Sequence, residues 1–456
     1  MRPPLPPGAT PPPVWKVFLM FLGPMMLANI LQSLSGTLNS VFLGQMIGVQ
    51  ALAAASAFFP VMLFLISFVM GLGSGASVLI GQAWGARQPE RVLAVAGTTL
   101  TCGVIGGAIV ALFGGTFAPS LLQALATPPD ILAPATAYAR VMLLAMPGLF
   151  VFLLVTSIMR GVGDMVTPLR ALLVSTAVGL LVTPALIRGW LGLPRAGVAS
   201  AAYAAAASFL ITLVWLAFHL RRKGHALAPS RNLLRHLKIE PTILKSVLRI
   251  GIPTAVQMVI MSLAEIALLS LVNGFGSAAT AAYGAGNQVL GYVQFPAMLI
   301  AIAASILGAQ AIGGGHSERL GPITRTGIWL NVAITGGLLV LGYLFSRSII
   351  GLFTQDAEVT EIAQRLLHIV LWSTLLFGAS AVVSGVMRAS GTVMIPTLLS
   401  ISAIVLVEVP VAWVLSRRMG LDGVWWAYPC TFATMLVLQS IYYRFFWRKQ
   451  KIQRLI

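Results

Sequence analysis

The chain has 456 residues, of which 58% are hydrophobic and only 9% are charged, and its mean hydropathy is +0.92. A chain this apolar is not a set of soluble domains, because runs of roughly 20 apolar residues are long enough to span a bilayer. The formal net charge of +18 does not indicate nucleic-acid binding, since the basic residues lie between apolar spans. The composition predicts a polytopic, all-α integral membrane protein.

The chain begins with a Pro-rich stretch, residues 1–14, which has no apolar core behind a basic start and no small-residue cleavage site. It is therefore predicted to be a cytoplasmic lead-in and not a signal peptide. Cys102 and Cys430 both lie inside predicted helices, and the five histidines lack the spacing of metal ligands. We expect no disulfide framework, no metal centre and no cofactor.

Twelve transmembrane helices are predicted from the apolar runs and the short polar connections between them. Six form an N-lobe over residues 15–221 and six form a C-lobe over 246–446, joined by a basic linker at 222–245 and followed by a basic tail at 447–456. The predicted spans are 15–47, 51–83, 92–116, 132–159, 166–188, 195–221, 246–274, 278–312, 322–346, 359–387, 394–416 and 422–446.

The basic residues predict the orientation of these spans. Assigning alternate connections to one side places 22 of the 29 Lys and Arg residues on that side. Because short cytoplasmic loops carry the excess of Lys and Arg, both termini are predicted to be cytoplasmic. The stretch from Arg221 to Arg249 supplies eight of these residues and the stretch from Arg444 to Arg454 supplies five, and the peptide IYYRFFWRKQK near the C-terminus is typical of an interfacial anchor.

An internal duplication relates the two halves at a constant offset of 228 residues. Gly85 corresponds to Gly313, and the pair Glu90 and Arg91 corresponds to Glu318 and Arg319. Six helices per half bring each half back to the side where it began, so the halves are parallel repeats about an axis along the membrane normal. This predicts two pseudo-symmetric six-helix lobes with a central cleft between them.

Two carboxylates lie deep in predicted spans. Glu265 follows Gln257 and Met261 on one helical stripe, at spacings typical of a cavity wall. Glu408 lies two residues before Pro410, where a kink frees backbone groups that the acid could bond. An acid at this depth marks an ion or substrate pathway by default, whereas the alternative is a neutral buried Glu bonded to a neighbouring helix. For Glu408 the site and the structural role are about equally supported.

Several motifs together resemble the multidrug and toxic compound extrusion (MATE) family, within the larger group that also holds lipid and oligosaccharide flippases. They are LNSVFLGQMIGVQALAAAS, GLGSGASVLIGQAWGAR, MRGVGDMVTP and GVWWAYP, and the resemblance covers nearly the whole chain from Lys16 to Tyr443. The GxGxxG-like look of GLGSGAS has no preceding strand, so close helix packing explains it better than phosphate binding.

The resemblance implies coupling acids at positions where this chain departs from the pattern. Asn39 stands where one bacterial branch has an acid in the first helix, and Thr183 stands where that branch often has Asp before the fifth-helix proline. The other branch has acids at the positions that correspond here to Met261 and Phe377. Glu265 lies one helical turn after Met261 on the same face. Asn39 could coordinate Na⁺ or bond a substrate, although interhelical hydrogen bonding is the slightly favoured explanation.

Helix 278–312 carries a mixed polar and aromatic face that includes Asn287, Gln288 and Tyr292. Such a face suits flat cationic compounds through ring contacts, although aromatic residues at this spacing are more often packing. The candidate substrate and ion site therefore consists of seven residues: Glu265, Asn39, Gln257, Met261, Gln288, Tyr292 and Glu408. If sodium is the coupling ion, we expect it near Glu265 or Asn39.

The predicted function is export of organic, cationic or amphipathic compounds by alternating access, driven by exchange for H⁺ or Na⁺, since the chain has no P-loop. We expect a monomer in the bacterial inner membrane. The alternative is a flippase for a lipid-linked oligosaccharide, which a cleft dense in Arg or Lys would favour. An intramembrane enzyme would need a cluster of catalytic groups, and a channel would conduct without a counter-ion.

Overall fold

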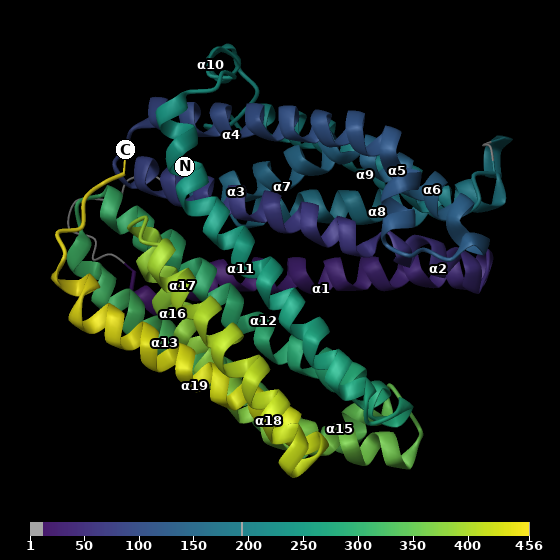
Figure 1. Ribbon diagram of the computed structural model, residues 1–456. Helices are drawn as coiled ribbons and strands as arrows, with labels where there is room; N and C mark the ends of the chain where they lie inside the picture. Colours follow the sequence, from purple (N-terminus) through teal and green to yellow (C-terminus); the bar gives the residue numbers. More distant parts are fainter. Residues whose placement is uncertain (1–11, 193–194, 456) are drawn as a thin grey trace. The chain divides into compact units, whose positions relative to one another are not determined.

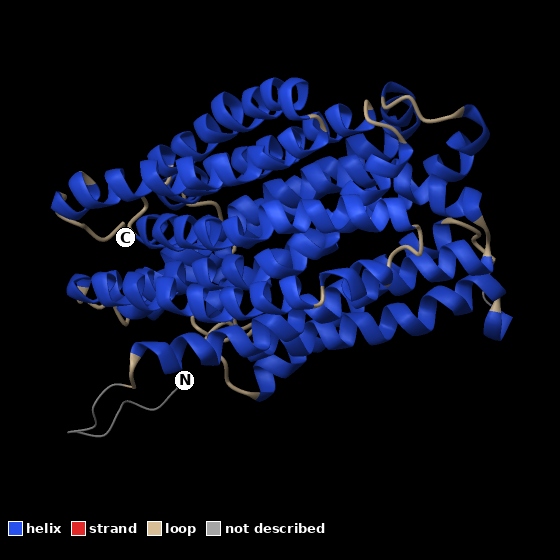
Figure 2. Cartoon of the chain, turned by 90° about the horizontal axis from the view of Figure 1, so that it is seen from below, coloured by secondary structure: helices blue, strands red, loops and turns tan. Residues whose placement is uncertain are grey.

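The computed structural model describes residues 12–192 and 195–455, and within these ranges every regular element is a helix (Figure 2). The predicted fold class, all-α, is therefore confirmed. Most of the predicted N-terminal lead-in, residues 1–11, lies outside the described residues.

The first half of the chain forms nine α-helices within its described residues. They are α1 (Val14–Met46), α2 (Val49–Ala57), α3 (Phe59–Gly85), α4 (Pro89–Ile109), α5 (Gly115–Ala124), α6 (Pro129–Leu144), α7 (Met146–Gly161), α8 (Val166–Arg188) and α9 (Ala199–Arg222). A π-helical turn, η1 (Val110–Gly114), joins α4 to α5.

The second half begins with the short helix α10 (Arg231–Arg235) and continues through nine more. They are α11 (Pro241–Asn273), α12 (Ser277–Gly313), α13 (Leu320–Leu344), α14 (Ser346–Gly351), α15 (Ala357–Val370), α16 (Thr374–Ala389), α17 (Met394–Ala403), α18 (Val409–Met419) and α19 (Leu421–Phe445). A second π-helical turn, η5 (Ile404–Glu408), joins α17 to α18.

Within the described residues, ten helical stretches are long and apolar enough to cross a membrane, and up to eleven if the pair α6 and α7, bent by 50°, counts as one. These match eleven of the twelve predicted spans. The twelfth, predicted at 422–446, is present as the 25-residue helix α19 but does not meet the same test of composition. It carries Trp425, Trp426 and Tyr428, whose amphipathic rings add little to a hydropathy sum.

Some predicted spans are interrupted helices. The span at 132–159 breaks between α6 and α7, where Pro147 stands near the start of α7 and has no N–H to continue the helical bonding. The span at 394–416 contains η5 just before Pro410, which likewise cannot donate to the preceding turn. Proline therefore sets both breaks by removing a backbone donor.

The chain forms two compact units. The first holds residues 24–84 and 88–251, and the second holds residues 85–87 and 252–455 together with the start of α1 as far as Gly23. In the first unit α4 packs with α7, and α9 packs with both α8 and α6. The motif GLGSGAS lies in α3, where a Cβ on Gly75 would come within 2.4 Å of the Val247 carbonyl oxygen. Close helix packing, as predicted, is what these glycines allow.

In the second unit α12 is the central helix. It packs with α13, α15 and α16, while α19 lies beside α16 and α18 (Figure 1). The core between these helices is apolar and contains the fully buried Leu366, Leu371 and Trp425. A Cβ on Gly385 of α16 would lie 2.4 Å from the Ala301 carbonyl oxygen of α12, so the two backbones are in direct contact.

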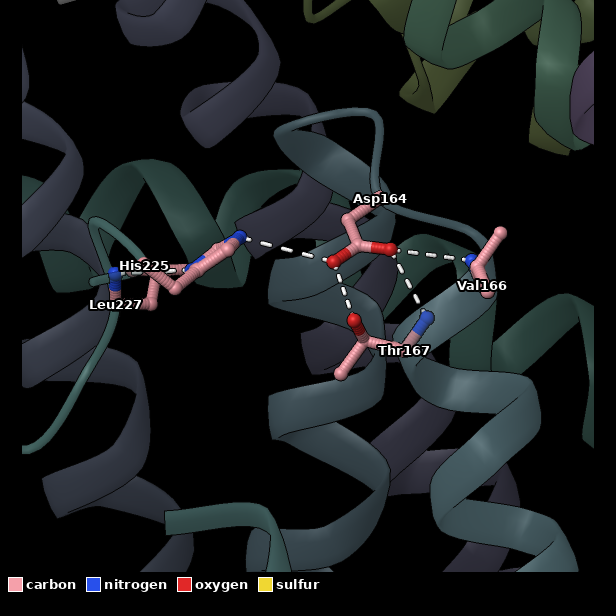
Figure 3. Close-up of polar contacts among 5 residues, drawn as sticks. All are labelled: Asp164, Val166, Thr167, His225 and Leu227. Carbon is pink, nitrogen blue, oxygen red and sulfur yellow. Dashed lines mark hydrogen bonds and ion pairs between the residues drawn. The ribbon is translucent and has the colours of Figure 1, made fainter. Parts of the chain in front are cut away.

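The segment predicted as the basic linker folds onto the first unit. The Thr98 hydroxyl donates to the Lys238 carbonyl oxygen (3.1 Å) and accepts from the Glu240 amide (3.3 Å). Figure 3 shows a second attachment, in which His225 Nε2 lies 3.7 Å from Asp164 Oδ2. Asp164 in turn accepts from the amides of Val166 and Thr167 and so satisfies two of the unpaired donors at the start of α8. The predicted lobe boundaries themselves stay a prediction.

Candidate functional site

A cavity of about 230 Å³ lies within the second unit and is lined by side chains from α11, α12, α16, η5 and α19. Glu265 and Glu408 both reach it, although 143 residues separate them in the sequence. Six of the other thirteen lining residues carry amide or aromatic side chains. The lining residues are Met261, Ala264, Glu265, Gly284, Asn287, Gln288, Leu290, Gly291, Gln294, Phe377, Ile404, Glu408, Tyr428, Phe432 and Met435.

Glu408 is held at the inner wall by an irregular stretch of helix. It ends the π-helical turn η5 and is 6% exposed, which makes it the only buried acid among the described residues. A π turn inserts an extra residue into a helix and redirects the side chains around it, and such turns are frequent at functional sites. The break predicted near Pro410 thus places the acid in the cavity.

Glu265 occupies a different position in the same cavity. It lies on the regular helix α11, one turn after Met261, and its side chain is exposed as well as lining the cavity. The two acids of the cavity therefore differ in exposure, Glu265 being exposed and Glu408 buried.

Tyr428, which lines the cavity, is paired with Tyr283, which lies outside the lining. The hydroxyls of Tyr283 and Tyr428 lie 2.9 Å apart, and the Tyr283 ring stacks on Trp425 with a centroid distance of 5.7 Å. Phe377 and Phe432 add a second ring contact at 5.2 Å. The bonded hydroxyls join α12 to α19 next to the cavity.

The electrostatics of the cavity favour a cation. Glu265 and Glu408 line the same cavity, and no Lys, Arg or His is among the lining residues that the structure describes. Two like charges at one site are stabilised when they share a proton or bind a cation. An acid in a membrane-spanning segment is by default a candidate for an ion or substrate site. The described residues hold no group of three or more His, Cys, Asp or Glu suited to a metal ion.

The structure brings four of the seven predicted site residues together: Glu265, Met261, Gln288 and Glu408. Tyr292 is adjacent, because its hydroxyl accepts a hydrogen bond from Gln288 Nε2 (3.1 Å), but it does not line the cavity. Gln257 lies two turns before Glu265 on α11 and is outside the lining. Tyr428, Phe432 and Gln294 were not predicted, since polar and aromatic residues in apolar helices give no distinguishing pattern.

Asn39 belongs to the first unit and takes no part in this cavity. Its Oδ1 accepts a hydrogen bond from the hydroxyl of Thr183, at 3.3 Å, and Thr183 is fully buried. Two of the four positions singled out by the resemblance, Asn39 and Thr183, are therefore partners that join α1 to α8. This contact agrees with the interhelical hydrogen bond that the sequence slightly favours for Asn39.

A family model described as MatE matches the chain twice, over residues 24–185 and again over 253–414. The chain belongs to the MatE family. The two matches fall one in each half, as expected of the predicted duplication, and the second contains Glu265 and Glu408. Tyr428 and Phe432 lie beyond the matched part of this MatE chain.

The MatE chain is similar to bacterial proteins over almost its full length. It is 45% identical over 447 residues to the Bacillus subtilis "Probable multidrug resistance protein YoeA", which covers 98% of this chain and 96% of the relative. It is 25% identical over 432 residues to the "Multidrug export protein MepA" of Staphylococcus saprophyticus, with 93% of each chain covered.

Solved structures of MATE transporters share the fold of this MatE chain. The Vibrio cholerae transporter VcmN superposes with a TM-score of 0.88 at 20% identity, covering 96% of this chain and 98% of that one. A MATE protein crystallised in a straight conformation gives a TM-score of 0.86 at 23% identity over 95% and 96% of the two chains. At these identities the likeness establishes the two-lobed fold.

Proposed function

We propose that the protein is a secondary efflux transporter that exports organic, cationic or amphipathic compounds in exchange for H⁺ or Na⁺. Family membership supports the transport role, and the names of the relatives, multidrug resistance and multidrug export proteins, support the substrate class. The observation that carries the coupling is the pair of carboxylates, Glu265 and Glu408, in one cavity without a neighbouring cation.

In this proposal the two acids hold the coupling ion in one state and release it in another. A proton, or Na⁺ held by the carboxylates and nearby amide oxygens, relieves the repulsion between the acids. Entry of a cationic substrate at Glu265 supplies the opposite charge and displaces the ion. Because a ligand shifts a two-state equilibrium only by its differential affinity, the loaded and unloaded cavities would favour opposite faces of the membrane.

The positions of the basic residues support both termini being cytoplasmic in a bacterial inner membrane. We further propose that the transporter acts as a monomer, with the bilayer as its surroundings.

The test is ethidium efflux from proteoliposomes under an imposed proton gradient and, separately, under a sodium gradient. We expect one gradient to drive efflux, and Glu265→Gln and Glu408→Gln each to slow it by about tenfold or more, the scale of a lost charge-assisted contact. Glu361→Gln is the matched control, because Glu361 is an exposed acid on α15 outside the cavity.

Full efflux with intact gradient dependence in both variants would contradict the role of the acids. Absence of dye efflux under either gradient, together with movement of a lipid-linked oligosaccharide, would favour the flippase alternative. The cavity offers that alternative no support, since a diphosphate-linked substrate calls for cationic side chains and none lines the described cavity.

A further inference from the structure

A second and larger cavity in the second unit has the opposite electrostatic character. It measures about 570 Å³ and lies where the start of α1, the turn after α3, the end of α12 and the C-terminal tail meet. Four cationic or ionisable basic side chains line it: Arg87, His316, Arg319 and Arg454. No Asp or Glu is among its described lining residues. The nearest acid along the chain, Glu318, bonds His316 Nδ1 at 3.2 Å.

The end of α3 and the end of α12 are in close contact at one side of this basic pocket. A Cβ on Gly85, at the end of α3, would lie 2.1 Å from the Gln310 carbonyl oxygen of α12, so only a glycine permits this approach. Residues 85–87 consequently belong to the second unit, while the rest of α3 belongs to the first. Arg87 therefore lines the same pocket as His316 and Arg319.

Arg87 has an unfavourable backbone conformation, with φ at 56°. A residue with a Cβ is disfavoured there, and glycine is the usual choice. The duplication supplies the comparison, because the position 228 residues later is Gly315, with φ at 79°. One half of the chain thus has glycine at this turn, whereas the other half has arginine. Because arginine is strained at this position, we infer that its side chain has a function that offsets the cost in backbone energy.

The C-terminal tail completes the pocket. Trp447 is 2% exposed, its Nε1 donates to Ser390 Oγ at 3.0 Å, and its ring stacks on Tyr443 with a centroid distance of 5.2 Å. Leu455 packs over Gly391. These contacts fix the tail against the second unit, so that Arg454 reaches the turn at Gly315.

We propose that this pocket binds a phosphate group of an anionic ligand, held by Arg87, Arg319 and Arg454. The planar forks of arginine suit phosphate oxygens, and three converging from separate segments give a strong and specific site. One wall is apolar, formed by Val14, Val17 and Ile323, and the adjoining face of α1 exposes Trp15 and Leu19. A lipid with a phosphate monoester headgroup fits both walls, and a soluble phosphate fits only the basic one.

The experiment measures the melting temperature of the full chain in detergent micelles at constant ionic strength. The probes are dihexanoyl phosphatidic acid, dihexanoyl phosphatidylcholine and inorganic phosphate. We expect phosphatidic acid to raise the melting temperature in a saturable way and phosphatidylcholine, which has no net charge, to leave it unchanged. Inorganic phosphate acting alone would identify a soluble ligand for the same arginines.

The variant Arg87→Gly with Arg319→Gln is expected to weaken binding roughly tenfold or more, by loss of two charge-assisted contacts. Arg87→Gly restores the residue that the repeat uses, so the variant should fold at least as well as the native chain. The control, Arg448→Gln with Lys449→Gln, removes the same charge from the tail outside the pocket. Equal binding by both double variants, or no stabilisation by either phosphate probe, would overturn the proposal.

Discussion

One hydrogen bond determines the tautomer of the neutral His225 ring. The Leu227 amide donates to its Nδ1 at 3.2 Å, so the neutral ring carries its hydrogen on Nε2, which faces Asp164 (Figure 3). Protonation would set a second N–H against the Leu227 donor. Burial lowers the pKa of His225 below its ordinary value, Lys223 and His219 lower it further, and the Asp164 carboxylate partly offsets these effects.

This geometry predicts a pH dependence of stability. A lowered pKa in the folded chain means that the unfolded chain takes up the proton first, so stability is complete above about pH 6.5 and falls as the pH drops through the range below it. Melting temperatures of native chain and His225→Gln, measured from pH 7.5 to pH 5, should show the smaller fall in the variant. The exposed His316→Gln is the control, and identical curves for native chain and His225→Gln would contradict the prediction.

The two acids of the candidate site could be predicted because their residue type is unusual for its surroundings. Glu265 and Glu408 stand out because acids are costly in apolar spans. Tyr428 and Phe432 do not, since aromatic residues are ordinary in such helices. The Asn39 and Thr183 partnership spans 144 residues, and no local spacing could reveal it.

Close approach between helices in this chain depends on glycines at particular positions. Gly385 of α16 lies against the Ala301 carbonyl of α12, whereas nothing lies within 4 Å of a Cβ placed on Gly337 of α13. Both glycines occupy helix interiors, where alanine is intrinsically preferred.

Alanine substitution should therefore have opposite effects at the two positions. Gly385→Ala forces α12 and α16 apart and is expected to cost about 1–3 kcal/mol, the range for overpacking. Gly337→Ala is expected to stabilise by roughly 0.5–1 kcal/mol, because only the backbone preference changes. Thermal unfolding in detergent would measure both, and a shift of the same sign at the two sites would refute the packing argument.

Helix positions could be predicted better than helix breaks. Hydropathy located α8, α9 and α12 to within a few residues, because apolar length alone decides whether a segment spans a bilayer. The bend between α6 and α7 and the turn η5 depend on which carbonyls find other partners near Pro147 and Pro410. The partners of these carbonyls depend on the packing of neighbouring helices, and a hydropathy pattern carries no information about that packing.

At the scale of the whole molecule, repetition and charge carried most of the prediction. The offset of 228 residues predicted two related halves, and the family model matches each half once. The division into compact units could not be predicted in detail, because residues 85–87 and the start of α1 join the second unit through tertiary contacts.

The predicted orientation can be measured by cysteine labelling in intact cells. In a background in which Cys102 and Cys430 are alanine, Gln355→Cys lies between α14 and α15 and Gln450→Cys lies in the tail, both exposed. A membrane-impermeant maleimide should label Gln355→Cys directly and Gln450→Cys only after the membrane is opened, because the excess of Lys and Arg retains the tail inside. The reverse pattern would exclude cytoplasmic termini.

The first helix of each half is shared between the two units at equivalent positions. Residues of α1 up to Gly23 pack in the second unit, and residues of α11 up to Gly251 pack in the first. Phe18 and Leu22, like Val247 and Ile250, are at most 2% exposed there. The halves thus exchange segments reciprocally, as swapped dimers do. Proteolytic cleavage between α9 and α11 would leave two fragments that still copurify, since parting them would expose both buried segments to solvent.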